Sequence, residues 1–547
     1  MNWCDWIIIA IYALGLIAFS IYLGKTQQNQ CDYYLGGNRM SFWAIGISTM
    51  ATQCSSNSLL GAPAFVIAVG GLTWLQYELA VPLAMAGTIL FLMPFFRRLR
   101  LVSVYEYLER RFGPGTRTIL SLTFQFLRAF ATGVTVYGIS LVVQQITGLS
   151  FTVCALFLCA VTVIYDFLGG MKAVVYSDVI QMVILYVGII ICAVYGIYLC
   201  GGIGEVFRHF PADKMSALVW SRTGLGDYAG GGFAFLPMFC GGLFLYMSYY
   251  GCDQTQAQRA LSARSVDEAN ATLMVNGLLR FPLVLSYCLV GVIIGAYLIK
   301  FPEFTTHLRD AAGQVNYNLA LPVFVLKKFP HGLIGIVIAA LFAAAMSSLD
   351  STINSLSAVS MRDVYERFFE RNSHSPRLRL LLSRLTTLFW GTVCTTAAFF
   401  VADISGSIIE SINKIGSLLY GPILAVFLLG ILTRKANGIG ATTGLLTGFA
   451  ANAGLWLFAP AINWMWWNVA GCLITFGSGY LLSMAAGKTP SAAELDLLTF
   501  RGFAAANATQ RKWLRNCLYL SAYTFFIILV CYLIGRLPEW FGTGSGR

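Results

Sequence analysis

Ser347, Ser348, Asp350 and Ser351 form a polar cluster inside the run IGIVIAALFAAAMSSLDSTINSLSAV, which is otherwise apolar and long enough to cross a bilayer. At about 100° per residue, these side chains share one side of a helix, whereas alanine, leucine and valine cover the other. Small serines that bond their own backbone are common in packed membrane helices, but this interpretation does not account for Asp350. Hydroxyl and carboxylate oxygens suit a hard cation such as sodium, and a proton is the chief rival.

A second polar block interrupts the apolar run ISTMATQCSSNSLLGAP, within residues 42 to 70. Its polar side chains are Thr49, Thr52, Gln53, Ser55, Ser56, Asn57 and Ser58. We expect a broken helix here, because unwound backbone survives at membrane depth only where an ion, a solute or a cavity satisfies its polar groups. The run FCGGLFLYMSYYGCD is similarly interrupted by glycines, which predicts a second broken helix. Two such helices about five spans apart are typical of an inverted repeat of five plus five helices.

The composition excludes a soluble protein. The 547 residues are 57% hydrophobic and 11% charged, with a mean hydropathy of +0.71, which predicts an all-α integral membrane protein. Runs of about 20 apolar residues predict about fourteen transmembrane helices. They cover residues 4 to 24, 42 to 70, 72 to 96, 118 to 147, 149 to 168, 172 to 200, 231 to 252, 268 to 299, 331 to 361, 382 to 403, 408 to 432, 437 to 459, 463 to 486 and 514 to 535.

The distribution of charge predicts the topology. The formal net charge is +12, and most Lys and Arg fall in inward loops when the N-terminus is placed outside. The positive-inside rule therefore predicts that both termini lie outside a plasma or inner membrane, and it explains the basic runs without nucleic-acid binding. The N-terminal segment lacks a basic leader and a cleavage site, so we interpret residues 4 to 24 as a retained span.

The sequence offers no support for an enzyme. The four His lie far apart, without the spacing of metal ligands or of a general base. AAGKTP resembles the end of a phosphate-binding loop, but Leu482 stands where that loop needs glycine. The fourteen Cys are scattered and suit the packing of a core. A polytopic chain without a site for a fuel predicts a gradient-driven carrier, with a channel as the weaker alternative.

Ionisable side chains at membrane depth mark further candidates, because each costs roughly 2.5 to 3.5 kcal/mol to insert without a partner. They are Glu78, Arg128, Asp178, Arg280, Asp350, Glu410 and Lys414. We expect Arg280 and Glu410 to reach the membrane interfaces, and the others to belong to polar sites inside the protein.

Four segments resemble the sodium/solute symporter family, which has the LeuT-type inverted-repeat fold. They are YDFLGGMKAVVYSDVIQ (165 to 181), DQTQAQRALSARS (253 to 265), AALFAAAMSSLDSTINSLSAVSMRDVYE (339 to 366) and YGPILAVFLLGILTRKANGIGA (420 to 441). The resemblance includes sodium-galactose and sodium-sialic acid symporters. It implies one transporter domain over residues 1 to 547, with broken core helices one and six. The implied parts are an extra N-terminal span at 4 to 24, a ten-helix core at 42 to 432 and three C-terminal spans at 437 to 535.

The resemblance also implies where sodium, the coupling ion, binds, and it implies no organic cofactor. The family's conserved sodium site lies between core helices one and eight. In this chain that site would consist of carbonyl or hydroxyl oxygens of Ala51, Cys54, Ala344, Ser347 and Ser348. A second sodium site, found in some members, would consist of Asp178, Ser347, Asp350 and Ser351. Asp350 replaces a serine of some relatives, and two neighbouring carboxylates favour a cation or a proton between them.

For the solute, the resemblance leaves two alternatives. Residues that match contacts of sugar-transporting members are Gln53, Glu78 and Asn413; residues that match sialic-acid members are Ser55, Ser58 and Arg128. Arg128 needs an anionic partner, and a solute carboxylate and Glu78 are equal candidates. Tyr249 resembles the inner gate of the family, although packing explains a tyrosine there equally well.

The sequence therefore predicts a sodium-coupled symporter that imports a small organic solute across a lipid bilayer by alternating access. The solute is expected to carry a carboxylate, as sialic acid does, or to be a sugar or another neutral molecule. A carrier that uses protons at Asp178 and Asp350 is the remaining alternative.

Overall fold

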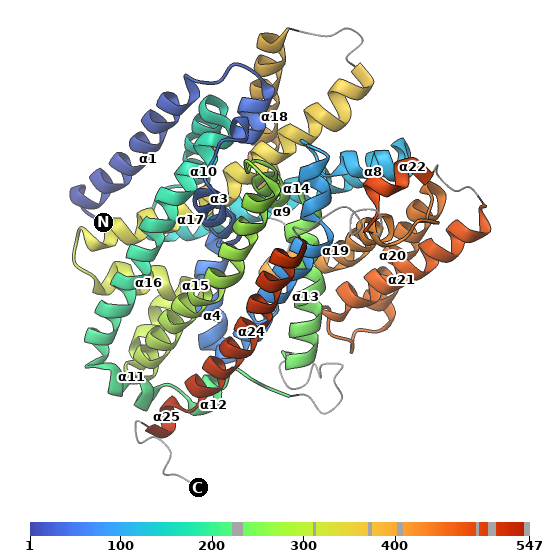
Figure 1. Cartoon of the computed structure of the whole chain (residues 1–547). Helices are drawn as coiled ribbons and strands as arrows, with labels where there is room; N and C mark the ends of the chain where they lie inside the picture. Colours follow the sequence, from blue (N-terminus) through green and yellow to red (C-terminus); the bar gives the residue numbers. More distant parts are fainter. Residues whose placement is uncertain are drawn as a thin grey trace.

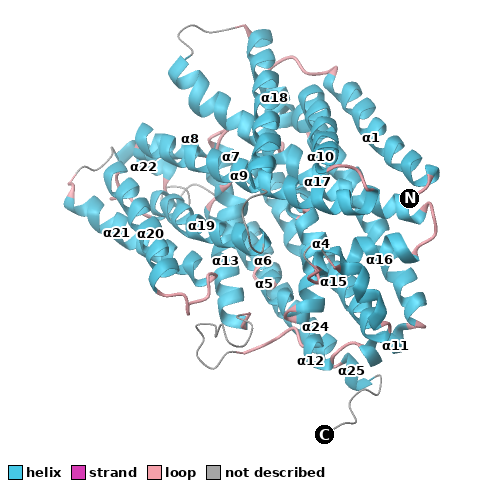
Figure 2. Cartoon of the chain, turned by 180° about the vertical axis from the view of Figure 1, so that it is seen from behind, coloured by secondary structure: helices cyan, strands magenta, loops and turns pink. Residues whose placement is uncertain are grey.

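The computed structural model describes a helical protein (Figures 1 and 2). It describes residues 1–220, 233–309, 313–369, 375–401, 408–487, 492–500 and 510–540. Within these ranges there is no β-strand, and only two isolated bridges pair extended residues, Met40 with Ala263 and Arg309 with Val315. The predicted all-α class is confirmed.

The helices of the first half are α1 (Trp3–Gly24), α2 (Gln30–Leu35), η1 (Gly36–Asn38), α3 (Phe42–Gln53), α4 (Ser56–Ala68), η2 (Gly71–Trp74), α5 (Leu75–Glu78), α6 (Val81–Phe91), α7 (Met93–Arg98), α8 (Tyr105–Phe112), α9 (Pro114–Thr147), α10 (Phe151–Cys200), α11 (Ile203–His209) and α12 (Ala212–Met215). Those of the second half are α13 (Phe235–Cys252), α14 (Gln254–Leu261), α15 (Val266–Lys300), η4 (Pro302–Leu308), η5 (Tyr317–Leu319), α16 (Ala320–Lys328), α17 (Leu333–Val359), η6 (Ser360–Phe369), α18 (Pro376–Phe400), α19 (Ile408–Leu432), α20 (Gly438–Phe458), α21 (Trp466–Ala485), α22 (Ala492–Leu498), α24 (Gln510–Gly535) and α25 (Leu537–Trp540).

Nine helical stretches of the described residues are long and apolar enough to cross a membrane. The predicted count of about fourteen spans stays a prediction, because the structure divides some predicted spans and joins others. The span at 42 to 70 is divided into α3 and α4, and the spans at 149 to 168 and 172 to 200 are joined in α10.

Helix α10 reverses direction at Gly170, whose φ of 52° and ψ of −156° are not helical. Its first part runs parallel to α17, since Phe157 packs on Phe342 and the Tyr165 hydroxyl donates to Asp350 Oδ2. Its second part runs the other way, because Asp178 is joined through Arg259 to Ser351, whereas Gly188, further along, packs against Ala340. Both parts therefore flank α17, and each presents polar side chains to the same stretch of that helix.

The reversal explains why residue 170 is glycine. Its backbone angles lie in a region that only glycine adopts readily, and a Cβ there would lie 2.6 Å from the Tyr33 carbonyl oxygen. Gly170→Ala should therefore lower the unfolding temperature, at a cost of about 2 to 6 kcal/mol for strain and overpacking together. Gly148→Ala is the matched control, because Gly148 has a φ of +74° with nothing within 4 Å of its Cβ position. Equal melting temperatures of the two variants in detergent would contradict this explanation.

The second predicted break lies at a different residue from the one expected. The glycines at 241 and 242 do not interrupt α13, which is continuous from Phe235 to Cys252. These glycines instead allow close packing, since their Cβ positions meet Met465 and Tyr77. The chain becomes extended at Asp253 and then enters the short helix α14, so the break follows the run of tyrosines.

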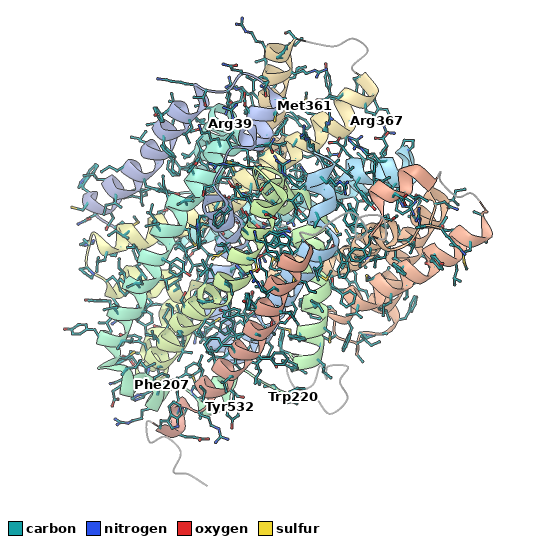
Figure 3. The ribbon with its side chains drawn as sticks, in the orientation of Figure 1. Arg39, Phe207, Trp220, Met361, Arg367 and Tyr532 are labelled. Carbon is teal, nitrogen blue, oxygen red and sulfur yellow. The ribbon has the colours of Figure 1, made fainter. Side chains whose placement is uncertain are left out.

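The labelled side chains mark the two ends of the molecule (Figure 3). Arg39, Met361 and Arg367 lie at one end, where the Arg264 side chain also donates to the Arg39 carbonyl oxygen. Phe207, Trp220 and Tyr532 lie at the other end, where the described chain also finishes (Figure 1). The start of α1 belongs to this second end, because Asp5 accepts a hydrogen bond from the Gly332 amide at the start of α17. Both termini are therefore on the same side of the bundle.

Candidate functional site

The break between α3 and α4 is the predicted broken helix. Helix α3 ends at Gln53, and Cys54 (φ −83°, ψ 70°) and Ser55 (φ −72°, ψ 166°) are not helical before α4 begins at Ser56. The last carbonyls of a helix have no intrahelical partner. At this break, two of them, those of Ala51 and Thr52, are directed toward α17 and accept hydrogen bonds from its serines.

Four residues of the first predicted sodium site converge at this break. The Ser347 hydroxyl lies 3.2 Å from the carbonyl oxygens of both Ala51 and Ala344. The Ser348 hydroxyl lies 2.9 Å from the Thr52 carbonyl oxygen and 3.4 Å from that of Ala344. The result is a group of neutral oxygens from two helices, of the kind that coordinates hard cations. The Thr52 carbonyl was not among the predicted ligands. Cys54, the fifth predicted residue, lies buried at the break itself.

The residues of the second predicted sodium site also come together. Asp178 Oδ2 accepts a hydrogen bond from Ser48 at 2.5 Å, and Ser351 Oγ lies 2.9 Å from Asp350 Oδ1 and 2.5 Å from the Ser347 carbonyl oxygen. However, a side chain that was not predicted lies among them. The guanidinium of Arg259 bonds both Asp178 and Ser351.

Arg259 escaped the search for ionisable side chains at membrane depth because it lies outside every apolar run. Helix α14 has a polar sequence, QTQAQRAL, yet all eight of its residues are buried. The polar helix is tolerated there because its side chains bond to neighbouring helices; Gln258 Nε2, for example, donates to Asn354 Oδ1 at 3.0 Å. The sequence held two signals for this segment: the break predicted within the run that forms α13, and the resemblance of residues 253 to 265 to the family.

Arg280 does not reach a membrane interface, so that prediction is wrong. It is 2% exposed and donates to Glu78 through Nε at 3.1 Å and Nη2 at 3.2 Å. Tyr246 donates to the same carboxylate at 2.8 Å. The ion pair compensates the cost of burying both charges, which explains why Arg280 can stay inside the bundle.

Arg128 also has a partner that the sequence did not indicate. It pairs with Asp253, not with Glu78: its Nε donates to Asp253 Oδ2 at 2.7 Å, and Nη2 lies 2.5 Å from the same oxygen. Its guanidinium carbon lies 4.8 Å from the ring centre of Tyr249 and 5.9 Å from that of Tyr420. Asp253 is the residue at the second break and caps α14 by accepting from the Thr255 amide. Arg128 therefore connects α9 to the broken helix α13–α14.

A cavity of about 990 Å³ joins these features. Five residues predicted to contact the solute line it, namely Gln53, Ser55, Ser58, Glu78 and Arg128. Tyr249 and Ser348 line it as well, so the cavity borders the first sodium site. The side chains of Asn413 and Glu410 lie outside the described residues.

The cavity extends from the middle of the bundle toward one end. Its wall includes Asn316 and Trp464, which belong to turns at the end that carries the termini. Arg128, Thr255 and Tyr249 line its opposite part, beside the second break. The ion pair between Arg128 and Asp253 therefore lies on the side of the cavity nearer the end that carries Arg39 and Arg367.

Comparison with known proteins identifies the family. The model of the sodium:solute symporter family matches residues 33–448. The chain belongs to this family. The symporter is 29% identical over 506 residues to a sodium/sialic acid symporter of Aliivibrio fischeri, which covers 90% of this chain and 96% of the relative. It is 28% identical to a sodium/sialic acid symporter of Proteus mirabilis, over 84% of this chain and 91% of the relative.

A solved structure agrees with this assignment. The substrate-bound outward-open structure of a Na⁺-coupled sialic acid symporter matches 89% of this symporter and 99% of its own chain, with 26% identity and a TM-score of 0.79. The LeuT-type fold and sodium-coupled secondary transport of a small organic solute are thereby confirmed, and the protein is a multi-pass membrane transporter and not an enzyme.

Proposed function

We propose that this symporter imports a small organic solute that carries a carboxylate, and that sialic acid is the first candidate. The observation that supports this most directly is the Arg128 guanidinium on the wall of the cavity, which the hydroxyl-bearing Ser55 and Ser58 also line. A guanidinium binds a carboxylate through two parallel hydrogen bonds, and hydroxyls suit the other polar groups of an acidic sugar. The sialic acid symporters among the relatives agree with this choice.

The contacts of Glu78 give this carboxylate a structural role. Oε1 accepts from Tyr246 and Arg280 and Oε2 accepts from Arg280, so a hydroxyl group of a neutral sugar would have to share Glu78 with Arg280. Gln53 remains suited to a solute contact, because it lines the cavity and its Oε1 has no hydrogen-bond partner among the described residues. In this proposal Gln53 and Arg128 bind the solute, and Glu78 positions Arg280.

Sodium is proposed to bind at the first predicted site, among oxygens of Ala51, Cys54, Ala344, Ser347 and Ser348. There it would tie the end of α3 to α17, and the residues that follow immediately, Gln53 to Ser55, line the solute cavity. An ion that orders this break raises the affinity for the solute, provided that it binds the outward and inward states with different affinity. Tyr249 would close the inner side of the cavity as the gate.

The end of the molecule that carries both termini is proposed to face outside an inner or plasma membrane. The basic side chains of Arg39, Arg264 and Arg367 lie at the other end, which the positive-inside rule places in the cytoplasm. With this orientation the cavity extends outward, and the Arg128–Asp253 pair closes it on the cytoplasmic side. The domain division, with a core at 42 to 432 and three spans at 437 to 535, is part of the same proposal.

Uptake into liposomes tests this function. Purified protein should accumulate labelled sialic acid when a sodium gradient is directed inward, and a tenfold gradient supplies about 1.4 kcal/mol, enough for about tenfold accumulation per sodium. Potassium in place of sodium is the control and should give no accumulation. Equal accumulation without sodium, under an imposed proton gradient, would instead support proton coupling through Asp178 and Asp350. A screen of sugars, amino acids and monocarboxylates for sodium-dependent thermal stabilisation would reveal another solute.

A further inference from the structure

A second, smaller cavity of about 260 Å³ lies at the end of the molecule that carries Arg39 and Arg367 (Figure 3). Its lining residues are Leu35, Asn38, Arg97, Arg100 and Leu101. None of them lines the solute cavity or belongs to a proposed sodium site. The walls of this cavity, the arginine pocket, are α2 with η1 on one side and the end of α7 with the turn that follows it on the other. Because liquid water takes about 30 Å³ per molecule, the pocket can hold a small polar group.

Arg97 is held in the arginine pocket by the backbone at the end of α14. Its Nε donates to the Ala263 carbonyl oxygen and its Nη2 donates to that of Arg264, both at 3.0 Å. Nη1 has no hydrogen-bond partner among the described residues. Burial and the charge of the neighbouring Arg100 lower the pKa of Arg97. The guanidinium is therefore ordered, partly withdrawn from water and close to a second positive charge.

No carboxylate balances these two charges within the described part of the chain. Arg100 is exposed, and its side chain forms no hydrogen bond or ion pair with a described residue. Asp32 on α2 accepts from the Gln28 amide at 3.0 Å and pairs with neither arginine. The positive-inside rule explains solvated arginines at this end, but a charge that is partly buried normally has a partner. The arginine pocket therefore lacks an anion.

The backbone of the arginine pocket is strained at two of its lining residues. Asn38 has a φ of 53° and Arg100 has a φ of 51°, and no other residue except glycine has a positive φ in the described ranges. This conformation is unfavourable for residues with a side chain, and such strain clusters at sites that clamp a ligand. Both strained residues line the same pocket, so the backbone and the charges independently indicate a binding site.

We propose that the arginine pocket binds a phosphate group, and that the headgroup of an anionic phospholipid supplies it. Guanidinium groups bind phosphate oxygens through paired, charge-assisted hydrogen bonds. Trp43 begins α3 only four residues after Arg39 and is 54% exposed, as is typical of tryptophans at the level of lipid headgroups. Basic pockets between helices suit such headgroups on the cytoplasmic side, where the proposed orientation places this end. The proposal depends neither on the solute nor on the sodium sites.

A phosphate in the arginine pocket would stabilise the junction between the two broken helices. Arg97 is bonded to the end of α14, and the Arg264 side chain donates to the Arg39 carbonyl oxygen just before α3. An anion between Arg97 and Arg100 would remove their mutual repulsion and hold the turn after α7 against this junction. Because the pocket exists only in the folded protein, its ligand should raise the melting temperature.

Thermal unfolding of the delipidated protein in a neutral detergent tests the proposal. Short-chain phosphatidylglycerol should raise the melting temperature in a saturable way. Phosphatidylcholine of the same chain length should not, because its choline group repels the arginines. Arg100→Gln should weaken phosphatidylglycerol binding by roughly tenfold or more, since it removes a charged partner of the phosphate. Arg110→Gln is the matched control: it removes an exposed arginine of α8 and should bind the lipid as the wild type does.

Inorganic phosphate separates the two sources of this chemistry. If it stabilises the wild type as strongly as the lipid does, and Arg100→Gln removes the effect, the phosphate pocket stands and its ligand comes from solution. Equal stabilisation by the two lipids, or wild-type lipid affinity in Arg100→Gln, would overturn the proposal. An equal loss of affinity in Arg100→Gln and Arg110→Gln would also overturn it, because only diffuse surface charge would then attract the lipid. Failure of sodium-driven uptake would contradict the proposed function and leave these results unchanged.

Discussion

Replacing Ser348 with alanine should abolish sodium-dependent uptake at ordinary sodium concentrations. The Ser348 hydroxyl lies beside the carbonyl oxygens of Thr52 and Ala344, so alanine removes one proposed ligand oxygen without disturbing the helix. A lost hydrogen bond or contact to a charged partner costs about 1.5 to 3 kcal/mol, which corresponds to roughly ten- to 150-fold weaker sodium binding. The sodium concentration that gives half-maximal uptake, and the sodium-induced rise in melting temperature, measure this loss.

A second serine of α17 provides the matched control. Ser357 is completely buried, and its hydroxyl donates to the Ser383 carbonyl oxygen at 3.0 Å and lies 2.7 Å from the Tyr34 hydroxyl, away from the break. Ser357→Ala should therefore leave the sodium dependence of uptake unchanged. If Ser348→Ala showed the sodium dependence of the wild type, Ser348 would not be a sodium ligand.

Arg128→Gln should remove most of the affinity for a carboxylate-bearing solute. The guanidinium is held between Asp253 and the rings of Tyr249 and Tyr420, and a solute carboxylate would meet a charge that is already ordered. Loss of one partner of a buried, hydrogen-bonded charge pair costs about 2 to 5 kcal/mol, or at least roughly thirtyfold in affinity. Sodium-dependent binding of labelled sialic acid to the purified variant measures the loss.

The chemistry of the solute separates a direct contact from a structural effect. An analogue in which the carboxylate is replaced by a neutral amide should bind the wild type much more weakly than the acid does. In Arg128→Gln this difference should disappear, because no cation remains to distinguish the two molecules. The sodium-induced rise in melting temperature without solute should be retained and serves as the control for folding. A variant that still prefers the acid would show that another group binds the carboxylate.

In the proposed function, sodium and solute would influence each other through a shared wall. Ser348 belongs to the proposed sodium site and also lines the cavity, and the α3–α4 break carries oxygens for both. Asp253 adds a second connection, since it pairs with Arg128 and caps α14. A solute carboxylate that competes with Asp253 for Arg128 would loosen α9 from the second break. Such competition offers a physical reason why binding of the solute would lead the cavity to open on the side that the Arg128–Asp253 pair closes.

Much of the site could be predicted because it depends on local patterns. The serines of α17 share a side by helical periodicity, and the polar block before α4 breaks the helix because its side chains compete for backbone hydrogen bonds. The glycines of α13 led to a wrong position for the second break. A glycine weakens a helix locally, but Gly241 and Gly242 instead allow neighbouring helices to pack closely.

By itself, the sequence determined the class of protein, the polar surface of α17 and the first break, since hydrophobicity and periodicity act over a few turns of one helix. Only the tertiary structure decided which charges pair. Glu78 and Arg280 are 202 residues apart, Arg128 and Asp253 are 125 apart, and Asp178 and Arg259 are 81 apart. Each pair is set by the packing of two helices, because a buried charge takes the nearest opposite charge in space, whatever its distance along the chain.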